Sequence, residues 1–186
     1  MKINSTVTPV CTTEIIAFAR TYTYFQNLNT DLLGLSIDSN SSHLAWVYEI
    51  YRKTGIRIPF PLIADRSGEI ARKYGMISND ISKTETVRNV FIIDDKQIVR
   101  TIFVYPLNVG RFIPEIIRTI QALQMADCSD GSTAANWLPG QPVIVQPPKT
   151  FSELVERQDS IESNKNGISW YLSFNQPPAI CKNKDI

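Results

Sequence analysis

The feature that most constrains the fold is a short apolar run, Leu32-Leu33-Gly34-Leu35-Ser36-Ile37, with helical periodicity on both sides of it. Such a short run, closed by the polar cluster Asp38 to Ser42, is typical of a strand buried inside a parallel sheet. Apolar residues recur at helical spacing over residues 11–28 before the run and over 44–51 after it. A buried strand between two amphipathic helices predicts a layered α/β fold.

The later part of the chain continues this alternation. Its expected elements are a strand at 61–64, a small helix at 65–74, strands at 87–93 and 98–105, and a last regular helix at 110–124. The two longer strands are expected to form a hairpin through residues 94–97. Pro114 falls in the first turn of the last helix, where a missing N–H costs little. This order of elements matches the later part of a thioredoxin-like fold.

The chain changes character after Met125. Residues 128–150 hold glycines and four prolines with little periodicity, which predicts an extended arm rather than a second core. Residues 151–161 are expected to form a short helix. The aromatic run at 170–174 is too short to bury itself, so we expect it to dock on a partner subunit. The predicted domains are therefore residues 1–126 and an arm of residues 127–186.

Composition limits the possible partners. The chain has 186 residues, of which 43% are apolar, and this is enough for a substantial core. Its 19 basic and 18 acidic residues give a net charge of +1 without a basic stripe, so neither nucleic acid nor a membrane surface is an expected partner. No apolar run approaches membrane-spanning length, and the N-terminus lacks the apolar region of a signal peptide. A reducing, cytoplasmic location is expected.

The cysteines are Cys11, Cys128 and Cys181, which are far apart and form no C-x-x-C pair. With His43 as the single histidine, neither a metal centre nor a cofactor is expected. Cys11 lies at the start of an amphipathic segment, where free backbone N–H groups and the helix dipole favour a thiolate. Thr8 lies three residues earlier, so its hydroxyl can turn back toward the sulfur. Cys128, at the end of the last predicted helix, is expected to be structural.

The run T-P-V-C-T-T-E at 8–14 resembles the active-site loop of the peroxiredoxins, thiol peroxidases with the motif Pro-x-x-x-Thr-x-x-Cys. Four further segments resemble the one-cysteine class of that family. They are G-L-S-I-D-S at 34–39, F-P-L-I-A-D at 60–65, R-N-V-F-I-I-D at 88–94 and Y-P-L-N-V-G-R at 105–111. N-W-L-P-G at 136–140 and W-Y-L-S-F at 170–174 resemble the C-terminal extension of its archaeal-type members. The resemblance implies a thioredoxin-like (peroxiredoxin) fold with an extended C-terminal arm.

The resemblance also implies a role for individual residues. Cys11 would be the peroxidatic cysteine and Thr8 its hydroxyl partner. Arg88 and Arg111 match two arginines of the family's active site, and Glu14 can bridge to Arg111. Taken without the resemblance, Arg88 could equally be a solvated charge at a strand end, and Arg111 a surface residue of the last helix. The groups expected to contact the peroxide are Thr8, Val10, Arg88 and Arg111, whereas His43 is given no catalytic role.

Two departures from the family pattern bear on function. Only ten residues precede Cys11, and Asn4 stands where the motif has proline, so we expect an N-terminally truncated fold that lacks the strand leading into the cysteine loop. Residues 1–4 are not expected to replace that strand. Archaeal-type relatives place resolving cysteines at positions that here are Gly167 and Ser173. Cys181 remains as a possible resolving cysteine, although a one-cysteine mechanism with an external thiol is favoured.

The predicted function is thiol-specific reduction of hydrogen peroxide and organic hydroperoxides, in antioxidant defence, through a sulfenic acid on the peroxidatic cysteine. The expected partners are a thioredoxin-like protein or small thiol as reductant, and further copies of the chain in a homodimer or larger ring. The alternative is a catalytically impaired peroxiredoxin-like subunit that acts as a scaffold or holdase. A dithiol oxidoreductase is disfavoured, because Cys11 has no C-x-x-C partner.

Overall fold

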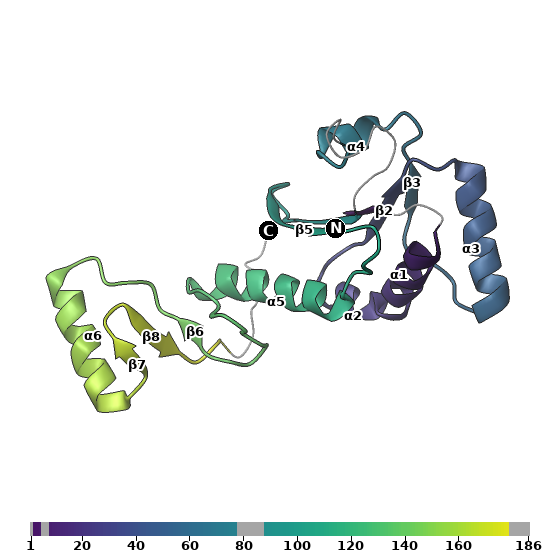
Figure 1. Ribbon diagram of the computed structural model, residues 1–186. Helices are drawn as coiled ribbons and strands as arrows, with labels where there is room; N and C mark the ends of the chain where they lie inside the picture. Colours follow the sequence, from purple (N-terminus) through teal and green to yellow (C-terminus); the bar gives the residue numbers. More distant parts are fainter. Residues whose placement is uncertain (1, 5–7, 78–87, 179–186) are drawn as a thin grey trace. The chain divides into compact units, whose positions relative to one another are not determined.

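The computed structural model describes residues 2–4, 8–77 and 88–178, and the chain forms two compact units that meet after Pro114 (Figure 1). The first unit is built on a mixed five-stranded sheet in the order β3-β2-β1-β4-β5. Strands β1, β2 and β3 run parallel, and β4 is antiparallel to both β1 and β5. The strands are β1 (Lys2–Asn4), β2 (Leu33–Ser36), β3 (Leu62–Ala64), β4 (Arg88–Ile93) and β5 (Val99–Tyr105). The four strands predicted from sequence and the hairpin at 94–97 are thereby confirmed.

Strand β1 corrects the expectation that the leading strand is missing. It occupies the centre of the sheet, where Ile3 lies opposite Gly34 of β2 and Val90 of β4. Asn4, at the position of the motif proline, is paired with Leu35 of β2. Ladder pairing uses main-chain N–H and C=O groups, so a short extended segment can pair whatever its side chains are. Residues 2–4 therefore supply the strand that sequence reasoning expected to be absent.

The described residues of the first unit form the helices α1 (Pro9–Arg20), α2 (Tyr22–Asn27), α3 (Asn40–Thr54) and α4 (Glu69–Lys73). The single helix predicted over residues 11–28 is divided into α1 and α2 at Thr21. The Thr21 hydroxyl donates to the Ala17 carbonyl oxygen at 2.8 Å, and such back-bonding bends helices. Helix α3 is capped by Ser39, whose hydroxyl oxygen accepts the Ser42 N–H, and it ends at Gly55, which has a φ of 71°.

The two faces of the sheet carry different helices because side chains alternate along each strand. Gly34 and Leu62 face the side on which Phe18 of α1 packs. A β-carbon at Gly34 would overlap the end of the Leu62 side chain, which would have to move to admit it. The opposite face carries the cluster of Leu35 and Phe91 with Ala71 of α4 and with Met76. Helix α1, which bears the candidate cysteine, therefore packs on the face of the sheet formed by Gly34 of β2 and Leu62 of β3.

The second unit begins with α5 (Ile113–Ser129), which starts at the junction, and continues with β6 (Val143–Ile144), α6 (Phe151–Asn164), β7 (Gly167–Ser169) and β8 (Leu172–Asn175). The three strands form a sheet in the order β6-β8-β7. Two residues of the stretch expected to form an ordered or semi-extended arm, Trp137 and Val143, are among the most buried side chains. Trp137 is held by its Nε1–H bond to the Gln141 carbonyl and by an Arg118 bond to its own carbonyl, each 3.0 Å long.

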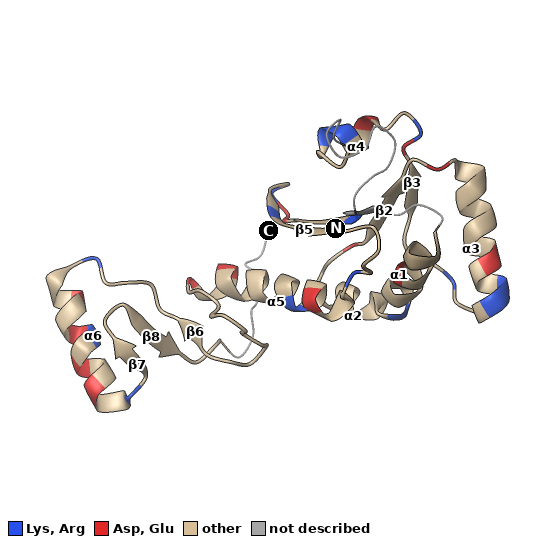
Figure 2. Cartoon of the chain, in the orientation of Figure 1, with Lys and Arg blue, Asp and Glu red and all other residues tan. Residues whose placement is uncertain are grey.

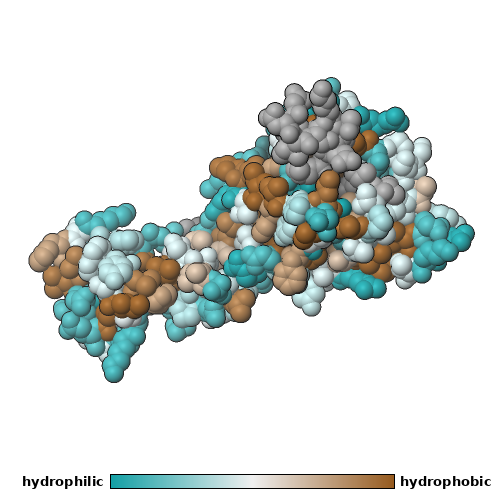
Figure 3. Space-filling model, viewed as in Figure 1, coloured by the Kyte–Doolittle hydropathy of each residue, from teal (hydrophilic) through white to brown (hydrophobic). Residues whose placement is uncertain are grey.

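Charged residues of both signs occur in both units of the described chain, and acidic residues predominate along α6 (Figure 2). Polar and apolar residues are mixed on the face drawn in Figure 3. Within the described ranges, no helix is long and apolar enough to cross a membrane. The same residues contain no group of three or more His, Cys, Asp or Glu side chains that could hold a metal ion.

Candidate active site

The first turn of α1 places Cys11. Thr8 is the N-cap, with an extended backbone at φ −130° and ψ 162°, and its hydroxyl oxygen accepts the Cys11 N–H at 3.2 Å. Pro9 takes the first helical position, where its fixed φ suits a helix and its missing N–H loses no bond. The T-P-x-C sequence thus dictates the local structure. Cys11 is the third residue of α1, and only 3% of its surface is exposed.

Arg88, the first residue of β4, lies directly against the sulfur. Its Nη1 is 2.9 Å from Cys11 Sγ, and its Nε donates to the Leu107 carbonyl oxygen at 2.8 Å. The side chain is 6% exposed, so the alternative of a solvated strand-end charge is wrong. The Leu107 carbonyl bonds to a different nitrogen of the guanidinium than Cys11 does, so the two contacts together fix its orientation. No sequence motif indicated this carbonyl, because it comes from the loop after β5.

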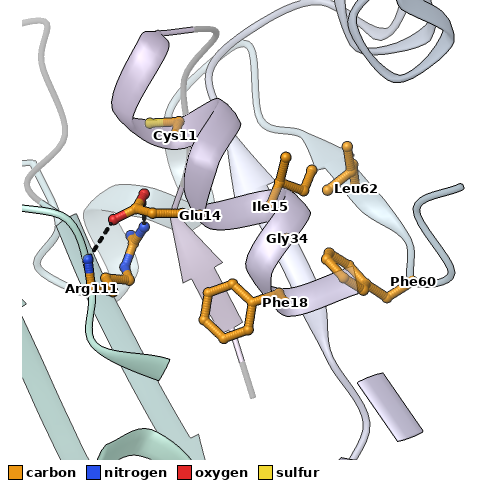
Figure 4. A pocket seen from close by; sticks show the side chains of 8 residues that line it. All are labelled: Cys11, Glu14, Ile15, Phe18, Gly34, Phe60, Leu62 and Arg111. Carbon is orange, nitrogen blue, oxygen red and sulfur yellow. Dashed lines mark hydrogen bonds and ion pairs between the residues drawn. The ribbon is translucent and has the colours of Figure 1, made fainter. Parts of the chain in front are cut away.

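Glu14 joins the two arginines. It follows Cys11 by three residues on the same face of α1. Its Oε2 accepts from Arg111 Nη1 at 2.7 Å, and its Oε1 accepts the Arg111 backbone N–H at 2.8 Å (Figure 4). Oε2 also accepts from Arg88 Nη1 at 3.1 Å. Sequence reasoning anticipated only the bridge to Arg111. One carboxylate therefore orients both guanidinium groups.

Arg111 is fully buried and does not belong to the surface of a helix. It precedes α5, its side chain is 0% exposed, and its Nη2 donates to the Asn89 carbonyl oxygen at 3.2 Å. Burial lowers the pKa of Arg111 from its ordinary value, while the charges of Glu14 and Cys11 oppose that shift. An arginine nevertheless stays protonated in a protein, so the buried charge remains.

The charges of this cluster favour a negatively charged sulfur. Arg88 and Arg111 contribute two positive charges and Glu14 one negative charge, which leaves a net charge of +1 beside Cys11. All of these side chains are buried, and charges interact more strongly there than in water. A thiolate on Cys11 would bring the cluster to neutrality. The geometry thus places complementary charge around the sulfur, which an isolated cysteine lacks.

A small cavity adjoins Cys11 between α1 and the sheet. Its volume is about 10 Å³, the space of roughly one water molecule. Figure 4 shows its lining, which is polar at Cys11 and apolar toward the sheet. The lining residues are Cys11, Glu14, Ile15, Phe18, Gly34, Phe60, Leu62 and Arg111.

The remaining predicted residues differ in their relation to this cluster. Val10 is the second residue of α1, where helix geometry gives its N–H no partner within the helix. His43 lies in the first turns of α3 and bonds outside the cysteine cluster: its Nε2 is 2.7 Å from Oγ of Ser36 in β2. Burial lowers the pKa of His43, and Asp38 partly opposes this. Sequence reasoning missed Trp46, whose indole N–H donates to Thr12 of α1 at 3.1 Å, because no sequence pattern links two residues on separate helices.

The chain has two further cysteines, and only one of them lies among the described residues. Cys128 is a partly buried free thiol in α5, and Cys181 lies outside the described residues. Archaeal-type relatives have resolving cysteines at the positions of Gly167 and Ser173, and both residues are closely packed here. A β-carbon at Gly167 would approach the Leu172 carbonyl oxygen to 2.7 Å. Ser173 is buried, and its Oγ accepts from Arg157 Nη1 at 3.1 Å.

Comparison with protein-family models gives two matches. Residues 3–102 match the AhpC/TSA family, and residues 122–160 match the C-terminal domain of 1-Cys peroxiredoxin. The first match spans strand β1, Cys11 and Arg88, and the second spans most of the segment that resembles the archaeal-type extension. Together they cover both units of the chain.

Individual proteins agree with these matches. The chain is 56% identical over 167 residues to peroxiredoxin 2 of Caldanaerobacter subterraneus subsp. tengcongensis, covering 90% of this chain and 75% of the relative. It is 46% identical over 187 residues to a peroxiredoxin of Aquifex aeolicus, covering 95% and 79%. Among solved structures, a yeast mitochondrial 1-Cys peroxiredoxin matches with a TM-score of 0.78 and 34% identity, covering 94% of this chain and 85% of that one.

Proposed function

This chain belongs to the peroxiredoxin family and is a thiol peroxidase, and from that premise we propose that Cys11 is the residue at which it reduces peroxides. One observation carries the assignment: Arg88 Nη1 lies 2.9 Å from Cys11 Sγ inside a buried cluster with one net positive charge. A guanidinium keeps its charge near neutral pH and presents several donors in one plane, so it can hold the sulfur and a peroxide oxygen together.

The proposed reaction starts with the Cys11 thiolate. It attacks the terminal oxygen of a hydroperoxide, so that an S–O bond forms while the O–O bond breaks. Cys11 becomes a sulfenic acid, and the departing alkoxide takes a proton to leave as an alcohol, or as water when the substrate is hydrogen peroxide. The peroxide is the oxidant in this step, and the sulfur is oxidised.

The departing oxygen is where negative charge develops, so donors aimed at it accelerate the reaction. Arg88, the Thr8 hydroxyl and the Val10 N–H all lie around the first turn of α1. Each such donor is typically worth about 3–4 kcal/mol in an acyl-transfer oxyanion hole. Glu14 and Arg111 can contribute to catalysis without contacting the peroxide, because they position Arg88. Glu14 accepts a hydrogen bond from Arg88 at 3.1 Å and one from Arg111 at 2.7 Å.

Regeneration requires a thiol from outside the site. An external thiol condenses with the sulfenic acid to form a mixed disulfide and water, and a second thiol then releases Cys11 and a new disulfide. We propose a thioredoxin-like protein or a small thiol in this role. The solved 1-Cys relative from yeast mitochondria is described as resolved through glutathione and thioredoxin systems, which supports the proposal.

The proposed homodimer forms along strand β5. Among the described strands, β5 ends the five-stranded sheet and has a neighbour only on its β4 side. Ile102 and Val104 on this strand are 51% and 66% exposed. An open strand edge with apolar side chains can pair with a second copy of itself, and leaving it bare invites aggregation. The domain division near residue 126, with the later part acting as a dimerisation arm, is likewise a proposal.

The function is tested by separating the two described cysteines. Cys11→Ser should abolish peroxide consumption and labelling by a dimedone-type sulfenic-acid trap, whereas Cys128→Ser should retain both. Equal losses from the two substitutions would contradict the assignment of Cys11. The alternative of a catalytically impaired subunit was based on the expected absence of the strand that leads into the cysteine loop. Strand β1 occupies that position, so this reason for the alternative no longer applies.

A further inference from the structure

The start of α1 is tied to α3 by hydrogen bonds that the proposed chemistry does not use. Trp46 Nε1, on α3, donates to Thr12 Oγ1 at 3.1 Å, and Thr12 Oγ1 donates to the Thr8 carbonyl oxygen at 2.8 Å. Thr8 is also the residue whose hydroxyl accepts the Cys11 N–H. A side chain of a separate helix is thereby connected to the turn that holds Cys11.

The bonding capacities of these groups match. An indole N–H is a donor only, and Trp46 is buried, so the Thr12 oxygen satisfies a donor that would be costly to leave unpaired. The Thr12 hydroxyl has one hydrogen, which goes to the Thr8 carbonyl, and its oxygen remains to accept from Trp46. A valine at position 12 would keep the shape of threonine and lose both bonds.

The two halves of the proposed cycle make opposite demands on this turn. A small peroxide reacts in the closed turn, where Arg88 lies against the sulfur. An external thiol must bring its own sulfur within bonding distance of Cys11 Sγ, and a residue that is 3% exposed does not admit a molecule of that size. The first turn of α1 must therefore open before reduction. A hydrogen bond that ties the turn to a neighbouring helix opposes this opening and slows reduction, whereas a bond between residues of the turn itself does not tie it to another element.

We propose that the Thr12 hydroxyl and the Trp46 indole form a latch that holds the cysteine-bearing turn closed and limits the rate at which an external thiol reduces oxidised Cys11. Both are positioning residues that act through Thr8. The inference rests on the proposed function, since it requires that peroxide oxidise Cys11. Breaking the latch raises the fraction of open turns, so it accelerates reduction while most molecules remain closed and competent for oxidation.

The test measures the two half-reactions separately in Thr12→Val, Thr12→Ser and Thr13→Val. The Thr13 hydroxyl donates to the Val10 carbonyl at 2.7 Å on the exposed side of the same turn, so Thr13→Val loses a comparable bond outside the latch. The protein is oxidised with one equivalent of hydrogen peroxide and then mixed with dithiothreitol, which converts the sulfenic acid to the thiol and yields cyclic disulfide and water. Thermal unfolding is recorded for each variant.

We expect Thr12→Val to be reduced about two- to tenfold faster than the wild type, the range for losing one hydrogen bond, here the bond that joins Trp46 of α3 to α1. Its oxidation rate should change by less than twofold, and Thr12→Ser and Thr13→Val should be reduced at the wild-type rate. Trp46→Phe breaks the latch from the other helix and should reproduce the acceleration.

Three results would overturn the latch. The first is a wild-type reduction rate in both Thr12→Val and Trp46→Phe. The second is equal acceleration in Thr13→Val, or acceleration that follows the loss of melting temperature across the whole set. The third is a Thr12→Ser variant that behaves like Thr12→Val. Failure of peroxide to oxidise Cys11 in the wild type would instead contradict the proposed function.

Discussion

Arg88→Lys tests how far the fixed geometry of the guanidinium contributes beyond its charge. Arg88 uses Nη1 for both Cys11 and Glu14, at 2.9 and 3.1 Å, and Nε for the Leu107 carbonyl at 2.8 Å. A lysine ammonium is a single compact charge on a flexible stem, so it cannot reproduce these three directions at once. Losing one hydrogen bond of a charged group costs about 1.5–3 kcal/mol. The rate of Cys11 oxidation should therefore fall roughly tenfold to a hundredfold.

The assay is stopped-flow measurement of the second-order rate of Cys11 oxidation by hydrogen peroxide. Arg52→Lys is the matched control, because it makes the same chemical change in an exposed pair with Glu49. Alkylation by iodoacetamide gives a second comparison, since the same sulfur then attacks a reagent from which no oxygen anion departs. Arg88→Lys should slow oxidation more than alkylation, because the peroxide reaction alone develops charge on an oxygen beside the guanidinium.

The reasoning is refuted by a folded Arg88→Lys variant whose oxidation rate lies within twofold of the wild type. Equal slowing of oxidation and alkylation would also refute part of it. In that case Arg88 would act only by favouring the thiolate and would contribute nothing specific to the departing oxygen.

Further predictions concern regeneration, pH and assembly. After peroxide treatment, non-reducing gels should show monomers, and a dimer that disappears in Cys181→Ser would contradict the one-cysteine mechanism. The lowered pKa of His43 means that the unfolded chain binds a proton more readily than the folded chain below about pH 6.5, so stability should fall as pH decreases through that region. The melting temperature should then drop more steeply between pH 7 and 5 in the wild type than in His43→Gln, and parallel profiles would exclude this origin. Val104→Lys on β5 should shift the protein to a smaller species in light scattering, and an unchanged mass would remove β5 from the interface.

Local patterns predicted most of the first unit because short apolar runs and capping residues act over a few neighbours. The run at 32–37 contains β2, and the helical spacing over residues 44–51 lies within α3. The break of α1 from α2 at Thr21 was missed, because threonine also occurs within regular helices. Within the predicted arm, proline and glycine content does not reveal that Trp137 forms hydrogen bonds with Arg118 and Gln141.

The candidate site shows a similar division. The resemblance around Cys11 indicated Thr8, Glu14, Arg88 and Arg111, and all four lie in one connected network with Cys11. What the sequence left out are the supporting contacts: the Leu107 and Asn89 carbonyls and the Trp46–Thr12 bond. Backbone carbonyls carry no sequence signature, and contacts across elements depend on how α1, α3 and the sheet are packed.

The largest error concerned strand β1, and it leads to a prediction about stability. Ile3 is paired with residues of both β2 and β4, so proline at this position removes a ladder N–H from the centre of the sheet and leaves an acceptor unpaired. An unpaired buried group costs about 1–3 kcal/mol, and each kcal/mol corresponds to roughly 2–4 °C in a chain of this size. Ile3→Pro should thus lower the melting temperature by about 2–12 °C relative to Ile3→Ala, which changes the side chain and keeps the N–H. Calorimetry of the two variants decides the matter. If both melt at the same temperature, the backbone of residue 3 contributes no pairing, and the three residues of β1 do not hold the middle of the sheet together.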